Sequence, residues 1–581
     1  MNSSGQLRVL VLDADLVPAL TISRSLARRG CRVDVAAHTA DPLAATSRVI
    51  SARYRYPDPL APGPEFVDWL VAHCRETAYD LVVPVTERTL VPLSRRREDC
   101  ADIRLAMPAA ASLEPVLDKS RTLALAQELD VPIPRSITVT TLEELAEHTG
   151  SLRYPVVMKP ARSIGSRDGG SSHLQVSYAF DPIGLVTGCG HALRFGAVVL
   201  QEFFRGDGVG VELIATQGEI LYAFQHRRLH EVPLTGGGSS LRVSEPVNAQ
   251  LLEASRRLVR ALDWHGVAMV EFKLDRASGE FCLMEINGRF WGSLPLADAA
   301  GADFPGMLLE LETRGELGPT RPYRNGIYCR LLSRDLMWYE SLLRGAGDDR
   351  LNRVPGRGEA LRHLALFLHP RHRLDVQSLR DPRPGLVDIR RILGVYRRRL
   401  GSLLQHKRFL RRQLRAWRKG RVAAAMAEAQ SVLFLCYGNI NRSALADAMV
   451  RGYAEDAGMT VYSAGFHPEG GRPADPVMVE IAADQGLDMS GNRSSVLDED
   501  LLQRSDIIFL MEKSHHDRLL FRFPDVADRV FLLGAHPADS VQSPEIDDPF
   551  GLPRGAYLAC YGRIAQAMDH IKGMIALRNN F

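Results

Sequence analysis

The chain has 581 residues, 45% of them hydrophobic and 24% charged, which is enough for three or four globular domains. Residues 1–5 carry no signal-peptide pattern and no run of about 18 apolar residues follows, so a cytoplasmic protein is expected. The eight cysteines form no C-x-x-C pair, which argues against structural zinc and against a disulfide framework.

The net charge of +3 conceals a local asymmetry. Thirteen Lys or Arg residues and no acidic residue lie between Arg390 and Arg421, and the rest of the chain carries an excess of acid. Because the basic character is confined to one segment, nucleic-acid binding by the whole protein is not expected.

The first hundred residues predict a parallel sheet covered by helices. Apolar strand patterns at 7–12, 31–36 and 80–85 alternate with helical stretches, the first of which closes at Gly30. No G-x-G-x-x-G follows the first strand, so this α/β domain is not expected to bind a dinucleotide.

Residues 118–172 contain elements suited to phosphate binding. Lys119 opens a helix, and a strand at 154–160 ends with Lys159. The glycine-rich loop that follows, 163–172, has backbone amides that could close over phosphate groups. A strand at 198–204 then carries Gln201 and Glu202, and a basic stretch at 225–233 includes Arg228.

The run Met284–Arg289 is the place where these elements converge. Glu285 and Asn287 are two residues apart on a predicted strand and therefore point the same way, and Glu271 lies on another predicted strand upstream. Their oxygen atoms suit Mg²⁺ that carries nucleotide phosphates. Each piece alone is more typical of an edge strand with solvated carboxylates, but the ordered set favours ATP binding.

Residues 7–312 resemble the ATP-grasp superfamily, specifically its carboxylate–amine ligases. The resemblance implies ATP and Mg²⁺ as cofactors, with Mn²⁺ as the alternative ion, and small-molecule carboxylate and amine substrates. Arg228 and Arg289 would contact the reacting phosphate and the acyl phosphate or substrate carboxylate. The implied phosphate, lid and adenine-hinge residues are Lys119, Lys159, Ser163, Gly165, Gly169, Gly170, Gln201 and Glu202, and the implied metal ligands are Glu271, Glu285 and Asn287. Gly208 stands where relatives often carry a ribose-binding acid, and Asp207 is the substitute.

The basic segment 390–421 predicts an amphipathic helix. Its apolar residues follow a seven-residue spacing, which leaves the other face densely cationic. We favour a linker helix that packs its apolar stripe on a neighbouring domain. The alternative is an interfacial helix on an anionic membrane surface, where Trp417 and the arginines would fit.

The C-terminal segment contains a cysteine loop between a strand at 431–435 and a helix. Cys436, Arg442 and Ser443 form a C-x5-R-S pattern whose amides wrap a tetrahedral anion and stabilise a thiolate that attacks phosphorus. Arg442 offers two hydrogen bonds to phosphoryl oxygens. This spacing is far more specific than a single buried cysteine.

Residues 431–581 resemble the low-molecular-weight protein tyrosine phosphatases, which implies a phosphomonoester or phosphotyrosine substrate. By this resemblance Asp548, before Pro549, is the general acid, and Asp547 is the alternative. Asn441 stands where many relatives have a second cysteine, and Asn492 stands near a place often held by His. The related arsenate reductases need a downstream cysteine relay, which Cys560 alone does not suggest.

The predicted organisation is a multidomain α/β protein. It comprises an α/β domain (1–110), ATP-grasp α+β domains (111–325), an extension with the basic helical linker (326–430) and a parallel-sheet phosphatase domain (431–581). The predicted function is a bifunctional ligase and phosphomonoesterase. Its rivals are a regulatory phosphatase with a nucleotide-binding module and a membrane-surface adaptor. The sequence does not identify the acid, the amine, the phosphoester or the oligomeric state.

Overall fold

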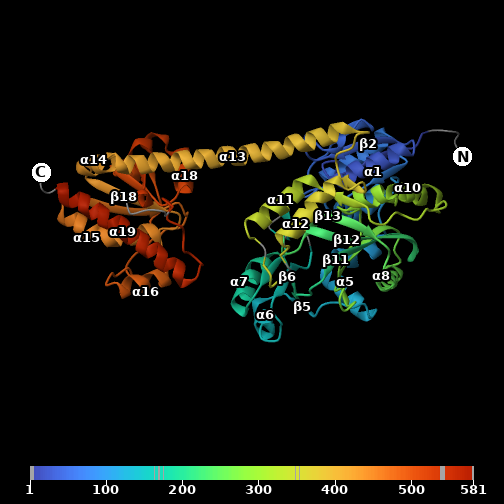
Figure 1. Cartoon of the computed structure of the whole chain (residues 1–581), viewed down its shortest axis with the longest axis horizontal. Coiled ribbons are helices and arrows are strands. Elements are labelled where there is room, and N and C mark those ends of the chain that lie inside the picture. The colour runs from blue at the N-terminus through green and yellow to red at the C-terminus, as the bar shows by residue number, and fades with distance from the viewer. Residues whose placement is uncertain are drawn as a thin grey trace. The chain divides into compact units, whose positions relative to one another are not determined.

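The computed structural model describes residues 6–162, 164–167, 170–173, 176–346, 348–351, 354–536 and 543–578, with side chains left undescribed at 164–167, 170–173 and 191. The chain divides into two compact units, Met1–Leu393 and Gly394–Phe581 (Figure 1). The four domains expected from the sequence are a finer division than these two units and stay a prediction.

The first unit begins with a parallel four-stranded sheet of order β3-β2-β1-β4. Three of the four β1 residues are buried, as expected for a parallel strand with helices on both faces. The predicted α/β domain is therefore confirmed. Its strands are β1 (Arg8–Val11), β2 (Arg32–Ala37), β3 (Ile50–Arg55) and β4 (Leu81–Val83).

Two further sheets follow in the same unit, and one hairpin stands apart from both. The first sheet has the order β5-β10-β6-β9, and the second, with seven strands, has the order β15-β14-β11-β12-β13-β16-β17. Gln217 and Gly218 both adopt positive φ and so form the tight turn between β11 and β12. The strands are β5 (Ser136–Val139), β6 (Val156–Pro160), β7 (Ile164–Arg167), β8 (Gly170–His173), β9 (Ser177–Ala179), β10 (Val198–Glu202), β11 (Asp207–Thr216), β12 (Glu219–Val232), β13 (Gly238–Glu245), β14 (Gly266–Leu274), β15 (Phe281–Asn287), β16 (Tyr328–Arg330) and β17 (His372–Leu374).

Helices cover these sheets, and the start of one of them positions Lys119. The helices of the first unit are α1 (Val17–Arg28), α2 (Glu65–Glu76), α3 (Glu87–Arg95), α4 (Ala110–Leu117), α5 (Lys119–Glu128), α6 (Leu142–His148), α7 (Pro182–Ala192), α8 (Ala249–Ala261), α9 (Leu294–Ala300), α10 (Phe304–Arg314), α11 (Leu332–Leu343) and α12 (Arg357–Ala365). Asp118 caps α5 by accepting from the backbone amides of Ser120 and Arg121. This cap fixes Lys119 as the first helical residue.

The basic segment is one long helix, α13 (Pro382–Arg418), followed by α14 (Arg421–Glu428) (Figure 1). At its C-terminal end the apolar stripe is covered: Leu410 and Leu414 pack on the core of the second unit, and Trp417 is buried there. Farther back, Leu400 and Leu403 are 58% and 60% exposed. The stripe is thus packed over its last turns and open in its middle.

The second unit is built on a parallel sheet of order β19-β18-β20-β21, as expected for the phosphatase domain. Its remaining elements are β18 (Ser431–Cys436), α15 (Arg442–Asp456), β19 (Thr460–Gly465), α16 (Pro476–Asp484), α17 (Glu499–Gln503), β20 (Ile507–Leu510), α18 (Lys513–Arg522), β21 (Val530–Leu532) and α19 (Arg554–Arg578). Across the part of the chain that is described, no helix combines the length and the apolar character needed to cross a membrane.

Candidate active sites

Two carboxylates face each other across the ladder of β14 and β15. Glu271 pairs directly with Glu285, and Asn287 lies two residues farther along β15. The Asn287 Nδ2 group donates to Glu271 Oε1 at 3.1 Å and to Glu285 Oε1 at 3.2 Å. Like charges directly opposite on a sheet repel each other, so this arrangement needs cations nearby.

Basic side chains stabilise the ionised forms of the two carboxylates unequally. Burial, together with Glu285, raises the pKa of Glu271 although Arg228 forms an ion pair with it. Burial also acts to raise the pKa of Glu285, but Lys119 and Lys159 outweigh it and the pKa is lowered. The cluster therefore holds a carboxylate that is kept ionised next to one that is reluctant to ionise.

Arg228 lies at the centre of a second ionic group. Its Nη1 lies 3.3 Å from Oε1 of Glu231, whose Oε2 in turn accepts from Lys273 Nζ at 3.3 Å. Burial disfavours the charged guanidinium, but Glu271 and Glu231 outweigh it and raise the pKa of Arg228. The guanidinium is thus a permanent cation beside the carboxylate cluster.

Lys159 projects from β6 towards the same cluster. Its Nζ donates to Gln201 Oε1 at 2.6 Å, and Gln201 donates to Ser136 Oγ at 3.0 Å. Burial lowers the pKa of Lys159 to about 8, and the positive charge of Lys119 acts in the same direction, against the attraction of Glu285. An anionic ligand would reverse this shift.

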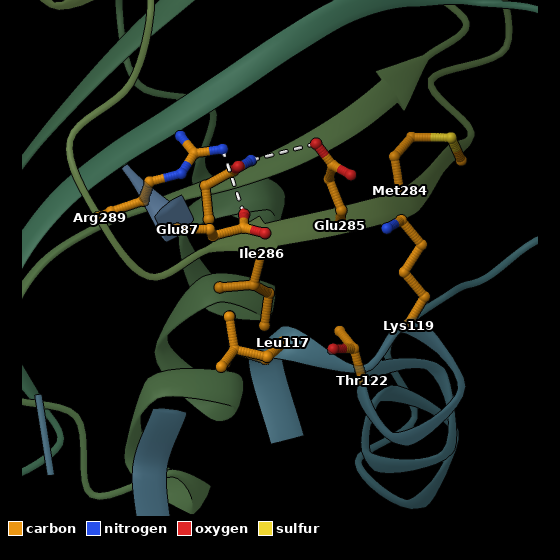
Figure 2. A pocket seen from close by; sticks show the side chains of 10 residues that line it. Glu87, Leu117, Lys119, Thr122, Met284, Glu285, Ile286 and Arg289 are labelled. Carbon is orange, nitrogen blue, oxygen red and sulfur yellow. Dashed lines mark hydrogen bonds and ion pairs between the residues drawn. The ribbon is translucent and has the colours of Figure 1, made fainter. Parts of the chain in front are cut away.

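Lys119 reaches the carboxylate cluster from the start of helix α5. Figure 2 shows it rising from the start of α5 towards β15, which carries Glu285, in a small cavity of about 60 Å³. Arg289 also lines this cavity and lies 3.3 Å from Glu87 Oε1. The predicted basic and acidic residues from four separate strands and a helix end are thereby brought together.

The predicted lid and hinge residues are placed only in part. The hairpin β7–β8 contains Gly165 and Gly170, whereas Ser163 and Gly169 lie outside the described residues. Glu202 Oε1 accepts a hydrogen bond from the backbone amide of Arg153 at 3.0 Å. Its expected contact with adenine therefore stays a prediction.

The absence of a side chain at Gly208 has a local steric reason. A Cβ atom there would lie 2.8 Å from Glu231 Oε1 and 2.9 Å from Arg228 Cδ, so a larger side chain would collide with that ion pair. Asp207, the expected substitute, is held 2.9 Å from Arg276 Nε. The departure from the ATP-grasp pattern thus goes together with the Arg228–Glu231 contact.

A wider cavity of about 490 Å³ adjoins Arg289. It is bounded by the carboxyl ends of β1 and β4, where ligands of open parallel sheets commonly bind, and by the segment after β15. Sequence reasoning missed its charged lining residues, which are Asp13, Asp15, Glu87, Arg88 and Arg334. For Asp13 and Asp15, their position just after β1 was the available signal.

The ligand atoms that these residues offer suit a magnesium–nucleotide complex. No group of three or more His, Cys, Asp or Glu residues that could hold a metal occurs among the described residues, so Glu271, Glu285 and Asn287 do not make a complete protein cage. Mg²⁺ usually keeps phosphate and water ligands in addition to one or two carboxylates. The Nε groups of Arg228 and Arg289 are buried without a hydrogen-bond partner, as expected beside a bound anion. These carboxylates, the asparagine and the two arginines therefore fit a magnesium–nucleotide complex.

The second centre is organised around the loop between β18 and α15. Cys436 Sγ lies 2.9 Å from Ser443 Oγ and 3.1 Å from the Asn439 backbone nitrogen, which donates to it. Asn439, with a φ of 51°, also donates through Nδ2 to Ser443 Oγ at 2.9 Å. Sequence reasoning missed this asparagine, which fixes both ends of the loop.

The loop is packed tightly against β19. A Cβ on Gly465 would lie 2.7 Å from the Tyr437 carbonyl oxygen and 3.0 Å from the Asn439 nitrogen, so only glycine lets the loop approach. On the other side, Arg472 Nη2 donates to the Gly438 carbonyl at 2.6 Å. The loop is therefore held in shape before any anion binds.

Arg442 is buried and joins the loop to two acidic side chains. Its Nη1 pairs with Glu512 and donates to the Ile546 carbonyl at 2.9 Å, and its Nη2 lies 2.5 Å from Asp548 Oδ2. Burial disfavours its charge, but Cys436, Asp548 and Glu512 prevail and raise the pKa of Arg442. Its Nε is buried without a hydrogen-bond partner.

The remaining predicted residues of this centre differ in whether they contact Arg442. Asp548 reaches Arg442, whereas Asp547 is exposed. Asn441 is buried with Nδ2 at 3.4 Å from Asp475 Oδ2, and Asn492 Nδ2 lies 3.4 Å from the Ala444 carbonyl. Burial raises the pKa of the Cys560 thiol to about 12. Glu512, at the end of the neighbouring strand β20, was missed by sequence reasoning.

Comparison with known proteins identifies two domains in this chain. Residues 431–578 match the family model "Low molecular weight phosphotyrosine protein phosphatase", and residues 194–332 match "ATP-grasp in the biosynthetic pathway with Ter operon". The chain therefore combines an ATP-grasp domain with a low molecular weight phosphotyrosine protein phosphatase domain, and through the latter it belongs to that phosphatase family. Both domains belong to enzyme families.

Individual relatives match the phosphatase domain over most of their length. The "Probable low molecular weight protein-tyrosine-phosphatase EpsP" of Ralstonia solanacearum is 33% identical over 140 residues, which are 24% of this chain and 92% of the relative. Wzb of Escherichia coli strain K12, another low molecular weight protein-tyrosine-phosphatase, is 31% identical over 131 residues, 22% of this chain and 85% of the relative. The L-amino acid ligase of Bacillus licheniformis superposes with a TM-score of 0.43 at 16% identity, over 55% of this chain and 79% of that protein.

Proposed function

We propose that the protein is a bifunctional enzyme in which an ATP- and Mg²⁺-dependent carboxylate–amine ligase is joined to a cysteine-dependent phosphomonoesterase. For the ligase, the observation that carries the proposal is the convergence of Lys119, Lys159 and Arg228 on the Glu271–Asn287–Glu285 cluster. For the phosphatase, it is the contact of Asp548 with Arg442 beside Cys436.

In the ligase, the basic residues hold ATP and neutralise the charge of the transferred phosphoryl group. Lys119 and Lys159 bind phosphate oxygens, and Arg228, a permanent cation, stabilises the oxygens on which negative charge spreads. Glu271, Glu285 and Asn287 hold Mg²⁺, which supplies Lewis-acid stabilisation of the phosphates when bound. The β7–β8 hairpin is the candidate lid that keeps water from the acyl phosphate.

The 490 Å³ cavity is the candidate site for the acid and the amine. Arg289 lines both this cavity and the smaller one beside Lys119, so a carboxylate bound to it would face the transferred phosphate. Arg334 adds a second guanidinium, whose pKa burial lowers, with Arg242 and Arg228 acting in the same direction. Asp15 and Glu87 offer counter-charges for an ammonium group.

In the phosphatase, Cys436 attacks phosphorus while the loop amides and Arg442 hold the three non-bridging oxygens. A phosphoryl group on Arg442 takes the place of Asp548, whose carboxyl group, once it has bound a proton, gives that proton to the leaving oxygen as the bond from phosphorus to that oxygen breaks. In the second step Asp548 accepts a proton from water, the water oxygen attacks phosphorus, and Cys436 leaves as the thiolate. Ser443, 2.9 Å from Sγ, stabilises that thiolate by hydrogen bonding.

One experiment tests both halves in the same preparation. The full chain is incubated with ATP, Mg²⁺ and the small-molecule fraction of a cell extract, and new condensed products are sought by mass spectrometry while aryl phosphate hydrolysis is followed separately. Products that require Glu285 and hydrolysis that requires Cys436 support the proposal. Hydrolysis without any ATP-dependent product supports the rival, a regulatory tyrosine phosphatase with a nucleotide-binding module, which the names of EpsP and Wzb favour.

For residues 390–421 an anionic membrane surface remains a candidate partner. Leu400 and Leu403 are exposed in the middle of the helix and are flanked by Arg397, Arg398 and Arg399. An amphipathic helix of this charge binds phosphatidylserine vesicles in a salt-dependent way. Co-sedimentation of the full chain with such vesicles, and its absence with neutral vesicles, is the expected result.

A further inference from the structure

The last turns of α13 complete the edge of the phosphatase sheet. β21 is an edge strand, so backbone groups of Leu532 point away from β20 and need partners outside the sheet. Trp417 Nε1 donates to the Leu532 carbonyl at 2.9 Å, and Gln413 Oε1 accepts from the Leu532 amide at 2.9 Å. The helix thus satisfies both groups and is an integral part of the phosphatase fold.

The same face of α13 reaches the loop that carries the candidate general acid. His406 lies two helical turns before Gln413 and therefore on the same side of the helix. Its Nε2 lies 3.0 Å from Glu545 Oε2. The other oxygen of this carboxylate, Oε1, accepts from the backbone amide of Lys513 at 2.7 Å. Glu545 thereby links α13 to the start of α18.

Glu545 is three residues before Asp548, and the contacts between them are continuous. The amide of Ile546 donates to the Met511 carbonyl at 2.9 Å, and its carbonyl accepts from Arg442 Nη1 at 2.9 Å. Asp548 then meets Arg442 Nη2 at 2.5 Å. A displacement of Glu545 would therefore be transmitted to Asp548 through two residues of backbone.

We propose that His406 is a positioning residue for the general acid. By holding Glu545 in place, it keeps the 545–549 loop where the Asp548 carboxyl group meets the leaving oxygen. The inference rests on the proposed phosphatase function and extends it to a helix outside the segment matched by the phosphatase family model. No catalytic contact by His406 itself is involved.

The test compares leaving groups in the full chain. His406→Ala should lower kcat/KM for phenyl phosphate, a poor leaving group, by about 10-fold and leave that for 2,4-dinitrophenyl phosphate within about 2-fold, because only the poor leaving group needs the proton. KM should change little. Glu545→Gln should give the same pattern. Lys407→Ala, which removes an exposed cation next to His406, is the matched control and should affect neither substrate.

A double substitution separates positioning from a general structural role. In the Asp548→Ala background, His406→Ala should cost less than about 2-fold with phenyl phosphate, because the acid it positions is already gone. A full further loss in that background, equal losses for both substrates, or no loss at all would overturn the inference. If the unsubstituted chain shows no Cys436-dependent hydrolysis, it is the proposed function that fails.

Discussion

Asp548 Oδ2 lies 2.5 Å from Nη2 of Arg442, a residue 106 positions earlier in the chain. The contact holds a carboxyl group at the rim of the loop in which Cys436 lies, and it separates Asp548 from the neighbouring Asp547, which is exposed. An acid held on the arginine that we propose binds phosphate is well placed for proton transfer to a leaving oxygen.

The first prediction concerns this acid. Asp548→Ala should reduce hydrolysis of phenyl phosphate by roughly 10²–10³-fold and that of 2,4-dinitrophenyl phosphate much less, because the better leaving group departs without protonation. Steady-state kinetics over a series of aryl phosphates measures this. Asp547→Ala is the control with the same charge change. Comparable losses across the series, or a larger effect from Asp547→Ala, would show that Asp548 is not the acid.

The second prediction concerns the carboxylate cluster. Glu285→Ala should lower ATP turnover by roughly 10²–10³-fold, since it removes both a metal ligand and the counter-charge of Lys119 and Lys159. Phosphatase activity should be unchanged. Glu280→Ala, which removes an exposed carboxylate just before β15, should leave both activities intact. Undiminished ATP turnover in Glu285→Ala would overturn the metal assignment.

The third prediction follows from Lys159. Burial lowers its pKa to about 8, so the amine loses its proton as the pH rises through about 8, and its attraction for ATP is lost with it. Bound phosphates favour the charged form, so MgATP binding at pH 8.5–9 should take up protons. Calorimetry in buffers of different ionisation enthalpy measures this uptake.

Lys159→Met provides the control for proton uptake. In that variant the buffer dependence of the binding enthalpy near pH 9 should be much reduced, and the affinity for MgATP should be low at every pH. Buffer dependence that persists unchanged in Lys159→Met would place the titrating group elsewhere.

The fourth prediction concerns oxidation. Peroxide converts the Cys436 thiolate to a sulfenic acid with release of water, and a neighbouring thiol would condense with it to a disulfide, again releasing water. Asn441 removes the neighbouring thiol that many relatives have, and Cys560 is protonated at neutral pH because burial raises its pKa to about 12. Without a disulfide to protect it, the sulfenic acid is oxidised by a second peroxide molecule to the sulfinic acid, so graded peroxide should cause inactivation that thiol reductants do not reverse.

Asn441→Cys should restore much of the activity that thiol reductants recover. Asn441→Ser, which introduces a side chain similar in size to Cys but without a thiol, should not. Recovery after dithiothreitol and the oxidation state of Cys436 by mass spectrometry report the outcome. Equal recovery in both variants would count against the role of position 441.

Local sequence patterns account for a large part of this picture. The Cys436–Arg442–Ser443 loop was predictable because eight consecutive residues, 436–443, which join a strand to a helix, determine its shape. The strands that carry Lys159, Glu271 and Glu285 were predictable from apolar runs, and the Glu285–Asn287 pair from the two-residue period of a strand.

What was not predictable depends on pairings between distant segments. The facing of Glu271 and Glu285 requires the register of β14 on β15, and the Arg289–Glu87 contact spans 202 residues. Likewise, an amphipathic pattern indicates that α13 has an apolar face but not that Trp417 and Gln413 bind the edge of β21. Such contacts follow from tertiary packing, which single residues do not encode.

We propose that both centres serve one synthesis, since a tether raises the effective concentration of one site near the other, to about the millimolar range. The competing hypothesis is that the phosphatase regulates protein partners independently of the ligase. The most direct test incubates the full chain, as Cys436→Ser and unsubstituted, with ATP, Mg²⁺ and a protein-free extract, and identifies products by mass spectrometry. The account predicts that Cys436→Ser accumulates a condensed product that still carries a phosphomonoester, which the unsubstituted chain converts to its dephosphorylated form. The same dephosphorylated product from both proteins would contradict it.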